Sequence, residues 1–528
     1  MSPVHDVLND RTRASIEKHD SISQLENASP ASDAIDAPPS LTPEQEKRLW
    51  RKVDFRLMPV LSLMYLLSFM DRGNIGNAKL DGLLTQLHLT GNKYNIALTM
   101  FFIPYCLFEC PANLVLKKVL LSYYRSVRWL PGITVLWGIV MTLMSLVKTQ
   151  DSFFSYIPLQ LITGNRYPQL VGVRVCLGVA EAGLFPGVVY YLTLWYPRHM
   201  LQYRIGLFFG AATIAGAFSG LLAFGIGYMG GIAGLEGWSW IFMLEGLATI
   251  VVAVIAFLVL VDFPDTAKFL TPEERAFIVW KKKYDNSSVG EEERFAARHV
   301  WAAFADWQVW LHIFVYFSII APLYGITLFL PTIIASFGYS TPISQLLTVP
   351  PYVVATTTLL IFAHYSDKLK MRSPFIFAGL VMLAIGFSIN ISRAPDGVKY
   401  FGTFFCVTGS YAAFPGVVSW LGNNLSGQYK RGVGMALHIG IGNLSGAISS
   451  NIYRSQDSPR FLLGHGLELM FVGIGFISVP IVVLLYKRIN HVRDEAERVA
   501  LERGEKIHYS KQEIRELGDR APDFRYTL

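Results

Sequence analysis

Apolar runs of about twenty residues recur along most of the chain, and this recurrence limits the folds that the chain can adopt. A helix needs about 20 apolar residues to cross a bilayer, and a spanning segment must satisfy its own backbone hydrogen bonds. The runs lie approximately at residues 57–78, 94–115, 127–147, 170–196, 205–228, 239–262, 308–334, 345–366, 374–392, 399–421, 432–452 and 466–487. The pattern therefore predicts an all-α membrane protein with twelve transmembrane helices. Composition agrees, because 52% of the 528 residues are hydrophobic and only 16% are charged.

Polar segments divide the apolar runs into larger units. Residues 1–45 are rich in Ser, Asp, Ala and Pro, a composition typical of a disordered tail. Residues 263–306 carry charged clusters and connect two sets of six helices, which we place at 46–262 and 307–488. Residues 489–528 form a second polar tail, for which we expect a frayed amphipathic helix and a disordered end.

The distribution of basic residues predicts the orientation. With an even number of spans both tails share a side, and the loops on that side carry most of the Lys and Arg clusters, including Lys281-Lys282-Lys283. The positive-inside rule therefore places both termini in the cytosol. The net charge of +7 is explained by these anchoring clusters, so we expect no nucleic-acid partner. Plasma and vacuolar membranes both remain open, and we favour the plasma membrane.

An internal repeat relates the two sets of six helices. Phe185-Pro186-Gly187-Val188-Val189 in the fourth span recurs as Phe414-Pro415-Gly416-Val417-Val418 in the tenth, and a glycine-rich span follows each copy. Two parallel six-helix repeats of this kind are typical of the major facilitator architecture, with two pseudo-symmetric bundles.

Residues 149–168 fit this scheme poorly. They make the loop between the third and fourth spans far longer than the usual few residues. The segment is either a genuine external loop or a translated intron from an error in the gene structure, and sequencing of the transcript distinguishes the two.

Four charged residues inside spans are the most informative, Asp71, Arg72, Arg174 and Glu181, whereas we interpret Glu109 in the second span as structural. Each costs at least about 2.5–3.5 kcal/mol to insert, so such residues usually have a functional or pairing role. At 1.5 Å per residue Asp71 and Arg174 reach the same depth of the bilayer if their helices are neighbours. We therefore expect a buried ion pair between Asp71 and Arg174. Glu181 falls near mid-depth.

This pairing leaves two groups for function. Arg72 is then free for a substrate carboxylate, and Glu181 is a carboxyl group in apolar surroundings that can gain and lose a proton. The alternative is that the charges are interhelical pins which hold the N-terminal bundle together.

The C-terminal half carries almost no buried charge by this reading, and its candidates are polar. Tyr324, Asn423 and Asn443 are possible substrate contacts, although close packing beside glycines explains Asn443 equally well. His438 is either a donor that lines a cavity or a satisfied core histidine.

Several segments together resemble the anion:cation symporter family of the major facilitator superfamily, in particular the fungal allantoate, nicotinate and pantothenate permeases. The matching segments are Met70–Ala78, Phe108–Asn113, Arg174–Pro186, Asn423-Asn424 and Lys430–Gly432. The resemblance extends over about residues 45–500.

The resemblance implies roles for individual residues. It implies that Arg72 and Asn77 lie at the substrate site, that Asp71 and Glu181 take part in proton coupling, and that Arg174 pairs with Asp71. The superfamily signature between the eighth and ninth spans is present as Asp367, Lys368 and Arg372, which it implies brace the cytosolic gate.

The resulting hypothesis is a secondary active transporter that imports a small organic anion, such as a vitamin, ureide or related carboxylate, together with protons. Export of an anionic metabolite or xenobiotic and a non-transporting nutrient receptor remain alternatives. We expect a monomer with no enzymatic activity, cofactor or metal, because the sequence shows no catalytic triad, phosphate-binding loop or metal-ligand spacing.

Overall fold

The computed structural model describes residues 41–121, 126–147, 166–261, 263–286, 297–426, 428–503 and 517–528, and every regular element in these ranges is a helix. The expected spans are occupied by α2 (Pro43–Ala78), α4 (Lys93–Leu121), α5 (Ser126–Met144), α6 (Arg166–Glu181) with α7 (Leu184–Trp195), α8 (Arg198–Gly227), α9 (Gly237–Val259), α12 (Trp307–Ala335), α14 (Val349–Leu369), α15 (Ser373–Ile391), α16 (Asp396–Asn424), α17 (Gln428–Ser449) and α18 (Leu462–Glu502). The predicted all-helical membrane fold is confirmed.

Nine segments in the described ranges are long and apolar enough to cross a membrane. In the most apolar of them, such as Gly237–Val259, the lipid-facing side chains stay exposed in the isolated chain; Leu258 is 78% exposed. Helices α4, α5 and α17 occupy the other three expected positions. Exposed leucines and valines on an outer surface are expected of a protein whose solvent is hydrocarbon.

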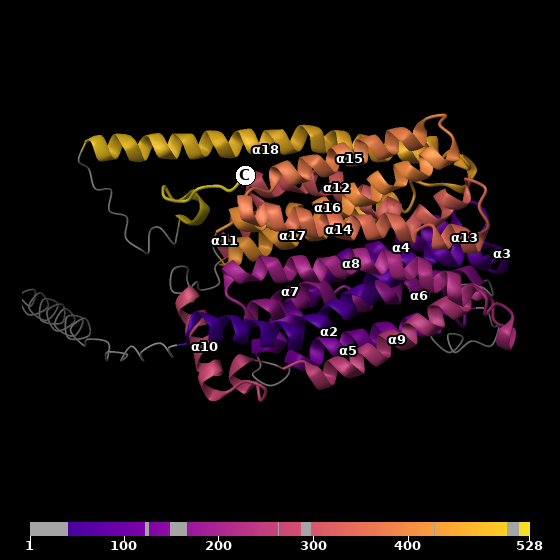
Figure 1. Ribbon diagram of the computed structural model, residues 1–528, viewed down its shortest axis with the longest axis horizontal. Helices are drawn as coiled ribbons and strands as arrows, with labels where there is room; N and C mark the ends of the chain where they lie inside the picture. The colour runs from indigo at the N-terminus through magenta and orange to yellow at the C-terminus, as the bar shows by residue number, and fades with distance from the viewer. Residues whose placement is uncertain are drawn as a thin grey trace, which may run out of the picture.

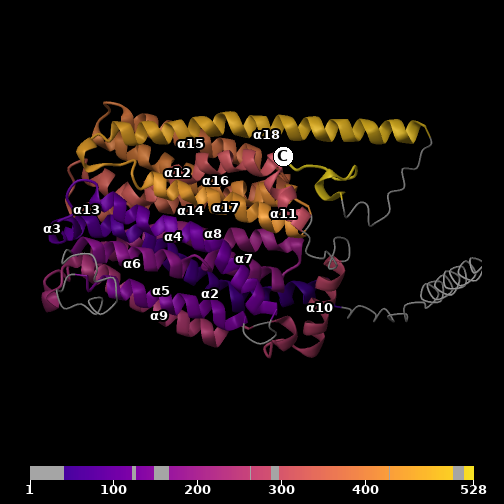
Figure 2. The same ribbon diagram turned by 180° about the vertical axis from the view of Figure 1, so that it is seen from behind.

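The helices lie roughly parallel and form two groups (Figure 1). Helices α2 to α9 make up one half of the molecule and α12 to α18 the other, and the view from behind shows the same division (Figure 2). Helices α10 (Pro272–Asn286) and α11 (Ala297–Phe304) lie at the end that also carries the C-terminus, which we call the tail face. Helices α3 (Leu84–Gln86) and α13 (Thr341–Leu346) lie at the opposite end, which we call the distal face.

Helix α2 fuses the expected basic amphipathic segment with the first span. Its start is set by a capping box, in which Thr42 Oγ1 accepts from the Gln45 backbone and the Gln45 side chain accepts from the Thr42 backbone. Ion pairs then attach α10 to this helix, because Lys52 binds Glu274 at 2.8 Å and Lys281 binds Glu46. Both ends of the described chain therefore lie at the tail face, as an even number of spans requires.

The fourth expected span is not one helix. Helix α6 ends at Glu181, and α7 begins at Leu184 after a short turn. Pro186 explains the break, since its ring has no N–H and clashes with the carbonyl four residues earlier, that of Ala182. The break matters because it places Glu181 at the end of a helix in the middle of the bundle.

Two expectations concern residues that lie mostly outside the described ranges. The N-terminal tail and most of the unusual segment 149–168 lie outside them, and α6 already begins at Arg166. The interpretation of 149–168 as a loop or an intron therefore stays open.

The expectation of a disordered C-terminal end is wrong for its last twelve residues. Residues 517–528 return to the tail face and bind the C-terminal half. Lys430 Nζ binds the Asp519 carboxylate at 2.7 Å, and Trp420 Nε1 donates to the Thr527 carbonyl at 3.0 Å. The backbone N–H of Arg372, which precedes α15, donates to Leu528 O at 2.5 Å. The polar composition led to the expectation of disorder, because composition alone does not reveal the specific buried residues that this segment binds.

Candidate functional site

A buried ion pair lies at the centre of the molecule, between the two halves. Arg72 on α2 donates from Nε and Nη2 to Glu181 Oε1, at 2.9 and 2.7 Å. The hydroxyl group of Ser68, one turn before Arg72, donates to the same oxygen. Arg72 is 6% exposed and Glu181 1%, so water screens the pair little. Glu181 Oε2 has no hydrogen-bond partner.

Aromatic rings surround the Arg72 guanidinium. Its central carbon lies 5.0 Å from the Phe69 ring, 4.8 Å from the Tyr105 ring and 5.7 Å from the Phe101 ring. Cation–π attraction of this kind contributes about 0.5–2 kcal/mol per contact and fixes the plane of the guanidinium. The rings replace part of the hydration that Arg72 loses, without supplying another negative charge.

The C-terminal half contributes a polar chain to the same site. Arg72 Nη1 donates to the Tyr324 hydroxyl at 3.2 Å, and that hydroxyl donates to Asn443 Oδ1 at 3.3 Å. Tyr316 donates to the same oxygen at 3.3 Å, and Asn443 Nδ2 donates to Glu109 Oε2 on α4 at 3.3 Å. Tyr324 and Asn443, both expected as substrate contacts, therefore lie at the ion pair, and the chain of hydrogen bonds crosses between the halves twice.

The expected ion pair between Asp71 and Arg174 is absent. Both residues are buried, but the two carboxylate oxygens of Asp71 and Nε and Nη2 of Arg174 have no hydrogen-bond partner. The expectations of an unoccupied Arg72 and an unpaired Glu181 are wrong for the same reason. Depth along the bilayer placed the four groups near one another, but it did not give the rotation of α2, which turns Arg72 toward Glu181.

Residues that interact electrostatically with Asp71 lie on three helices: Glu181 and Arg174 on α6, Trp137 on α5, and Glu245 on α9. Glu245 was not among the residues expected from the sequence. Glu245 is 2% exposed, and neither of its oxygens has a hydrogen-bond partner. A glutamate within the apolar run at 239–262 was a sufficient signal to find it, by the same rule that singled out Asp71.

Close helix packing holds α6 against the site. A Cβ atom on Gly178 would lie 2.3 Å from the main-chain oxygen of Phe101, so only glycine allows α6 and α4 to approach this closely. Gly178 lies one turn after Arg174 and one turn before Glu181. The glycine therefore sets the position of both charged side chains.

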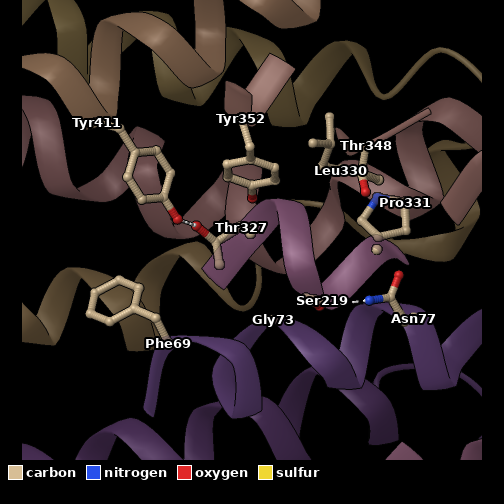
Figure 3. A pocket seen from close by; sticks show the side chains of 12 residues that line it. Phe69, Gly73, Asn77, Ser219, Thr327, Leu330, Pro331, Thr348, Tyr352 and Tyr411 are labelled. Carbon is tan, nitrogen blue, oxygen red and sulfur yellow. Dashed lines mark hydrogen bonds between the residues drawn. The ribbon is translucent and has the colours of Figure 1, made fainter. Parts of the chain in front are cut away.

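A narrow pocket lies between α2, α8, α12, α14 and α16, and its lining includes Gly73, the residue after Arg72 (Figure 3). Asn77, an expected substrate contact, lines it and donates to Ser219 Oγ at 2.9 Å, while Thr327 and Tyr411 join their hydroxyl groups at 2.8 Å. Tyr352 completes the polar lining. A second, apolar pocket shares Phe69 and Tyr411 with the first and continues to Phe209 and Phe414. The Phe-Pro-Gly repeat meets here, because the Phe209 ring contacts both Phe185 and Phe414.

Two of the expected substrate contacts do not reach the ion pair. His438 Nε2 bonds the main-chain oxygen of His312 at 3.1 Å, and its ring packs on Tyr316. Asn423 lies at the tail-face end of α16, beside Asn424, which holds Thr527. The structure favours the core reading of His438 and gives Asn423 no contact with the central site.

The expected gate residues meet in part. Arg372 binds Asp367 at 2.6 Å and donates to the Ser366 hydroxyl at 2.6 Å, which closes the turn between α14 and α15. Lys368 is exposed and takes no part in this contact. The expectation that the C-terminal half has almost no buried charge is wrong, because Glu468 on α18 is fully buried and both its oxygens lack a partner.

The two halves also touch at the distal face. Asn95 Nδ2 donates to the carbonyls of Ser450 and Tyr453, at 2.6 and 3.3 Å. Gln345 Nε2 donates to Asp81 at 2.7 Å, and Asn451 Nδ2 to Thr99 at 2.8 Å. These bonds close the distal face over the pocket.

Comparison with known proteins agrees with this architecture. The sequence profile of the Major Facilitator Superfamily matches residues 61–450. The chain is 32% identical to the MFS-type transporter cnsO of Penicillium expansum, over 91% of this chain and 90% of the relative. It is 31% identical to the high-affinity nicotinic acid transporter of Saccharomyces cerevisiae, over 93% and 86%.

A solved structure supports the fold independently. The inward-open xylose transporter XylE from E. coli aligns with a TM-score of 0.60 and 16% identity, over 81% of this chain and 96% of that chain. At this identity the likeness concerns the fold alone. Taken with the extensive sequence matches, it shows that the chain is a membrane transporter of the Major Facilitator Superfamily.

Proposed function

We propose that this transporter imports a small organic anion, such as a vitamin carboxylate or a related nutrient, together with protons. The observation that carries the proposal is the position of Arg72. Its guanidinium is buried between the halves and bound by a carboxylate of one half and a hydroxyl group of the other. A substrate carboxylate can replace Glu181 on Arg72, because one carboxylate oxygen can accept from both Nε and Nη2, as Oε1 of Glu181 does.

Proton coupling follows from this competition. When an anion takes Arg72, the ionised Glu181 loses its counter-ion and stays in a buried site, where an unpaired charge is expensive. Uptake of a proton by Glu181 removes that cost. The proton and the anion therefore enter the site together, and departure of the anion lets Glu181 return to Arg72.

Two further expectations belong to this proposal. The tail face is the cytosolic one in this proposal, which the basic loops support, and the plasma membrane is the location that we expect. In this orientation the distal face, where hydrogen bonds join the two halves, is the external one. The proposed six-helix bundles, residues 46–262 and 307–488, correspond to the two groups of helices in Figure 1.

Uptake by purified protein in liposomes tests the proposal. The yeast relative is named as a nicotinic acid transporter, so nicotinate is the first probe, followed by a panel of carboxylates including pantothenate and allantoate. An inward proton gradient should drive accumulation of at least one anion. The Arg72→Ala variant should lose binding of that anion, whereas Glu181→Gln should retain exchange and lose accumulation. Unchanged affinity in Arg72→Ala, or full accumulation in Glu181→Gln, contradicts the assignment.

The apolar pocket supports one alternative. Its lining by Phe69, Phe209, Leu323, Leu359 and Phe414 suits a larger, more hydrophobic anion than nicotinate. Export of such a metabolite predicts that substrate leaves cells faster when the external medium is acidic, whereas import predicts faster entry.

A further inference from the structure

The pocket in Figure 3 is polar but carries no charge. Twelve described residues line it, and none of them is acidic or basic. A carboxylate would find no positive partner among these residues and an ammonium group no negative one, so burial of either group there is costly. The pocket therefore suits a neutral part of a ligand.

Three hydroxyl groups in the lining use their protons within the protein. Thr348 Oγ1 donates to the Gln345 carbonyl at 2.7 Å. Thr327 Oγ1 donates to the Leu323 carbonyl at 2.7 Å, so Tyr411 is the donor in the 2.8 Å bond between the Thr327 and Tyr411 hydroxyl groups. Because a hydroxyl group has one proton and two lone pairs, these three groups offer a ligand acceptors and not donors.

Asn77 adds an acceptor that has no partner. Ser219 Oγ donates to Asn74 Oδ1 at 2.6 Å and accepts from Asn77 Nδ2 at 2.9 Å. These bonds turn the Asn77 oxygen away from Ser219, and in Figure 3 it points toward Pro331, which also lines the pocket. Asn77 is 2% exposed, and its Oδ1 has no hydrogen-bond partner. A buried acceptor in this state destabilises the site until a donor reaches it.

The pocket and Arg72 lie along the same two helices. Phe69 lines the pocket, and its ring lies 5.0 Å from the central carbon of the Arg72 guanidinium. On α12, Tyr324 accepts from Arg72, and Thr327, which lines the pocket, follows about one turn later. Arg72 and Asn77 are five residues apart on α2, or about 7.5 Å along its axis. A small carboxylate with one further polar group can span that distance.

We propose that the transported anion carries a neutral hydrogen-bond donor, a hydroxyl group or an amide N–H, which binds Asn77 Oδ1 in this pocket while the carboxylate binds Arg72. Ser219 is the positioning residue, because its bonds to Asn74 and Asn77 turn the amide oxygen toward the ligand. A site of this kind rejects an analogue without the donor, since its buried acceptor then stays unpaired. The inference rests on the proposed function and narrows it from organic anions in general to carboxylates with such a donor.

Matched ligands and wild-type protein test the inference by isothermal titration calorimetry. The meta- and para-hydroxybenzoates carry the donor, whereas the corresponding fluorobenzoates keep the ring, the charge and nearly the size but lack the donor. At least one hydroxybenzoate should bind about tenfold or more tightly than its fluoro counterpart. Equal affinities in both pairs, or tighter binding of the fluorobenzoates, overturn the inference.

Two substitutions test the residues in the same assay. Asn77→Leu removes the acceptor and should reduce the preference for the hydroxyl group to less than about threefold. Ser219→Ala lets the Asn77 amide turn its nitrogen into the pocket, so the preference should fall while the fluorobenzoate binds as before. A purely structural defect would instead weaken both ligands alike. An undiminished preference in Asn77→Leu contradicts the assignment.

Asn390→Leu is the matched control. Asn390 is likewise buried with an unpartnered Oδ1, but it lies on α15, outside the described lining, and donates to the Gly386 carbonyl at 2.9 Å. This variant should keep the wild-type preference. Loss of the preference in Asn390→Leu as well would show that it does not depend on the pocket, and would overturn the inference.

The two proposals fail in different ways. Methyl esters of the same compounds lack the negative charge and test the pocket without Arg72. If no carboxylate binds but the hydroxy ester binds more tightly than the fluoro ester, the proposed function fails and the donor site stands. If carboxylates are transported with protons but no hydroxyl compound is preferred, the proposed function stands and the inference falls. Absence of binding throughout overturns both.

Discussion

In the proposed function Glu181 competes with the substrate anion for Arg72 and also takes up a proton. Replacing Glu181 with glutamine keeps a hydrogen-bond acceptor for Arg72 but removes the charge and the ability to take up the proton. Glu181 Oε1 accepts two hydrogen bonds from Arg72 and one from Ser68. A glutamine carbonyl can accept the same bonds but carries no charge. The bonds from Arg72 remain, but the attraction between two opposite charges is lost; after the cost of burying the carboxylate is set against it, we take the net weakening as about 2–3 kcal/mol.

This loss predicts tighter anion binding. An incoming anion must displace Glu181 from Arg72, and a competitor that is weaker by about 2–3 kcal/mol corresponds to roughly 30- to 150-fold higher affinity. The gain should be present only where the wild-type Glu181 is ionised. At acidic pH the protonated wild type resembles the variant, so the two affinities should converge. The unliganded variant should also melt at a lower temperature, because Arg72 is left without a counter-ion in a buried site.

Isothermal titration calorimetry with nicotinate, or with the anion that the liposome panel selects, measures both effects at about pH 5.5 and pH 8. Glu109→Gln is the matched control, since this carboxyl group bonds Asn443 and not Arg72, and its affinity should change by less than about threefold. Equal affinities of wild type and Glu181→Gln at both pH values refute the idea that Glu181 competes with substrate.

Three further changes test the frame around the site. Gly178→Val should lower thermal stability by about 1–3 kcal/mol and reduce uptake, because the side chain would meet the Phe101 carbonyl; a variant with wild-type melting and uptake contradicts this packing. Deleting residues 518–528 removes several hydrogen bonds at the tail face and should lower the melting temperature, by about 2–4 kcal/mol of stability, in a thermal unfolding assay. Asn95→Ala leaves the Ser450 carbonyl unpaired and should open the distal face more often, as seen in faster labelling of a cysteine placed near it; unchanged labelling argues against a closing role.

Hydropathy predicted the fold well because a membrane span has a simple requirement. Twenty apolar residues suffice to cross the bilayer, so each expected run became a helix, and the exception was the break that Pro186 introduces after Glu181. The same rule identified Arg72, Arg174 and Glu181 as buried, which the structure shows. The same rule also covers Glu245 and Glu468, which lie inside apolar runs, but it was not applied to them.

The sequence could not show which arginine pairs with which carboxylate. Asp71 and Arg72 are adjacent and point about 100° apart around α2, so a modest rotation of the helix exchanges their partners. Tertiary packing decides that rotation, for example through Gly76, whose absent Cβ atom would lie 2.5 Å from the Leu328 main-chain oxygen on α12. Depth arithmetic could place Asp71 and Arg174 at one level of the membrane, but it could not choose which arginine met which carboxylate.

The bonds between the halves indicate how an anion could drive the change of state. At the distal face the halves are joined by the hydrogen bonds of Asn95, Gln345 and Asn451, and near the centre by those of Tyr324 and Asn443. At about 0.5–1.5 kcal/mol net for each, such a set contributes only a few kcal/mol. That is the size of the difference that one substrate can make, since a ligand shifts an equilibrium only by its differential affinity for the two states. An anion on Arg72 also alters the contact to Tyr324, so binding acts directly on a bond that joins the halves. The ion pair of Arg72 with Glu181 lies within the N-terminal half, so it does not itself have to break for the halves to separate.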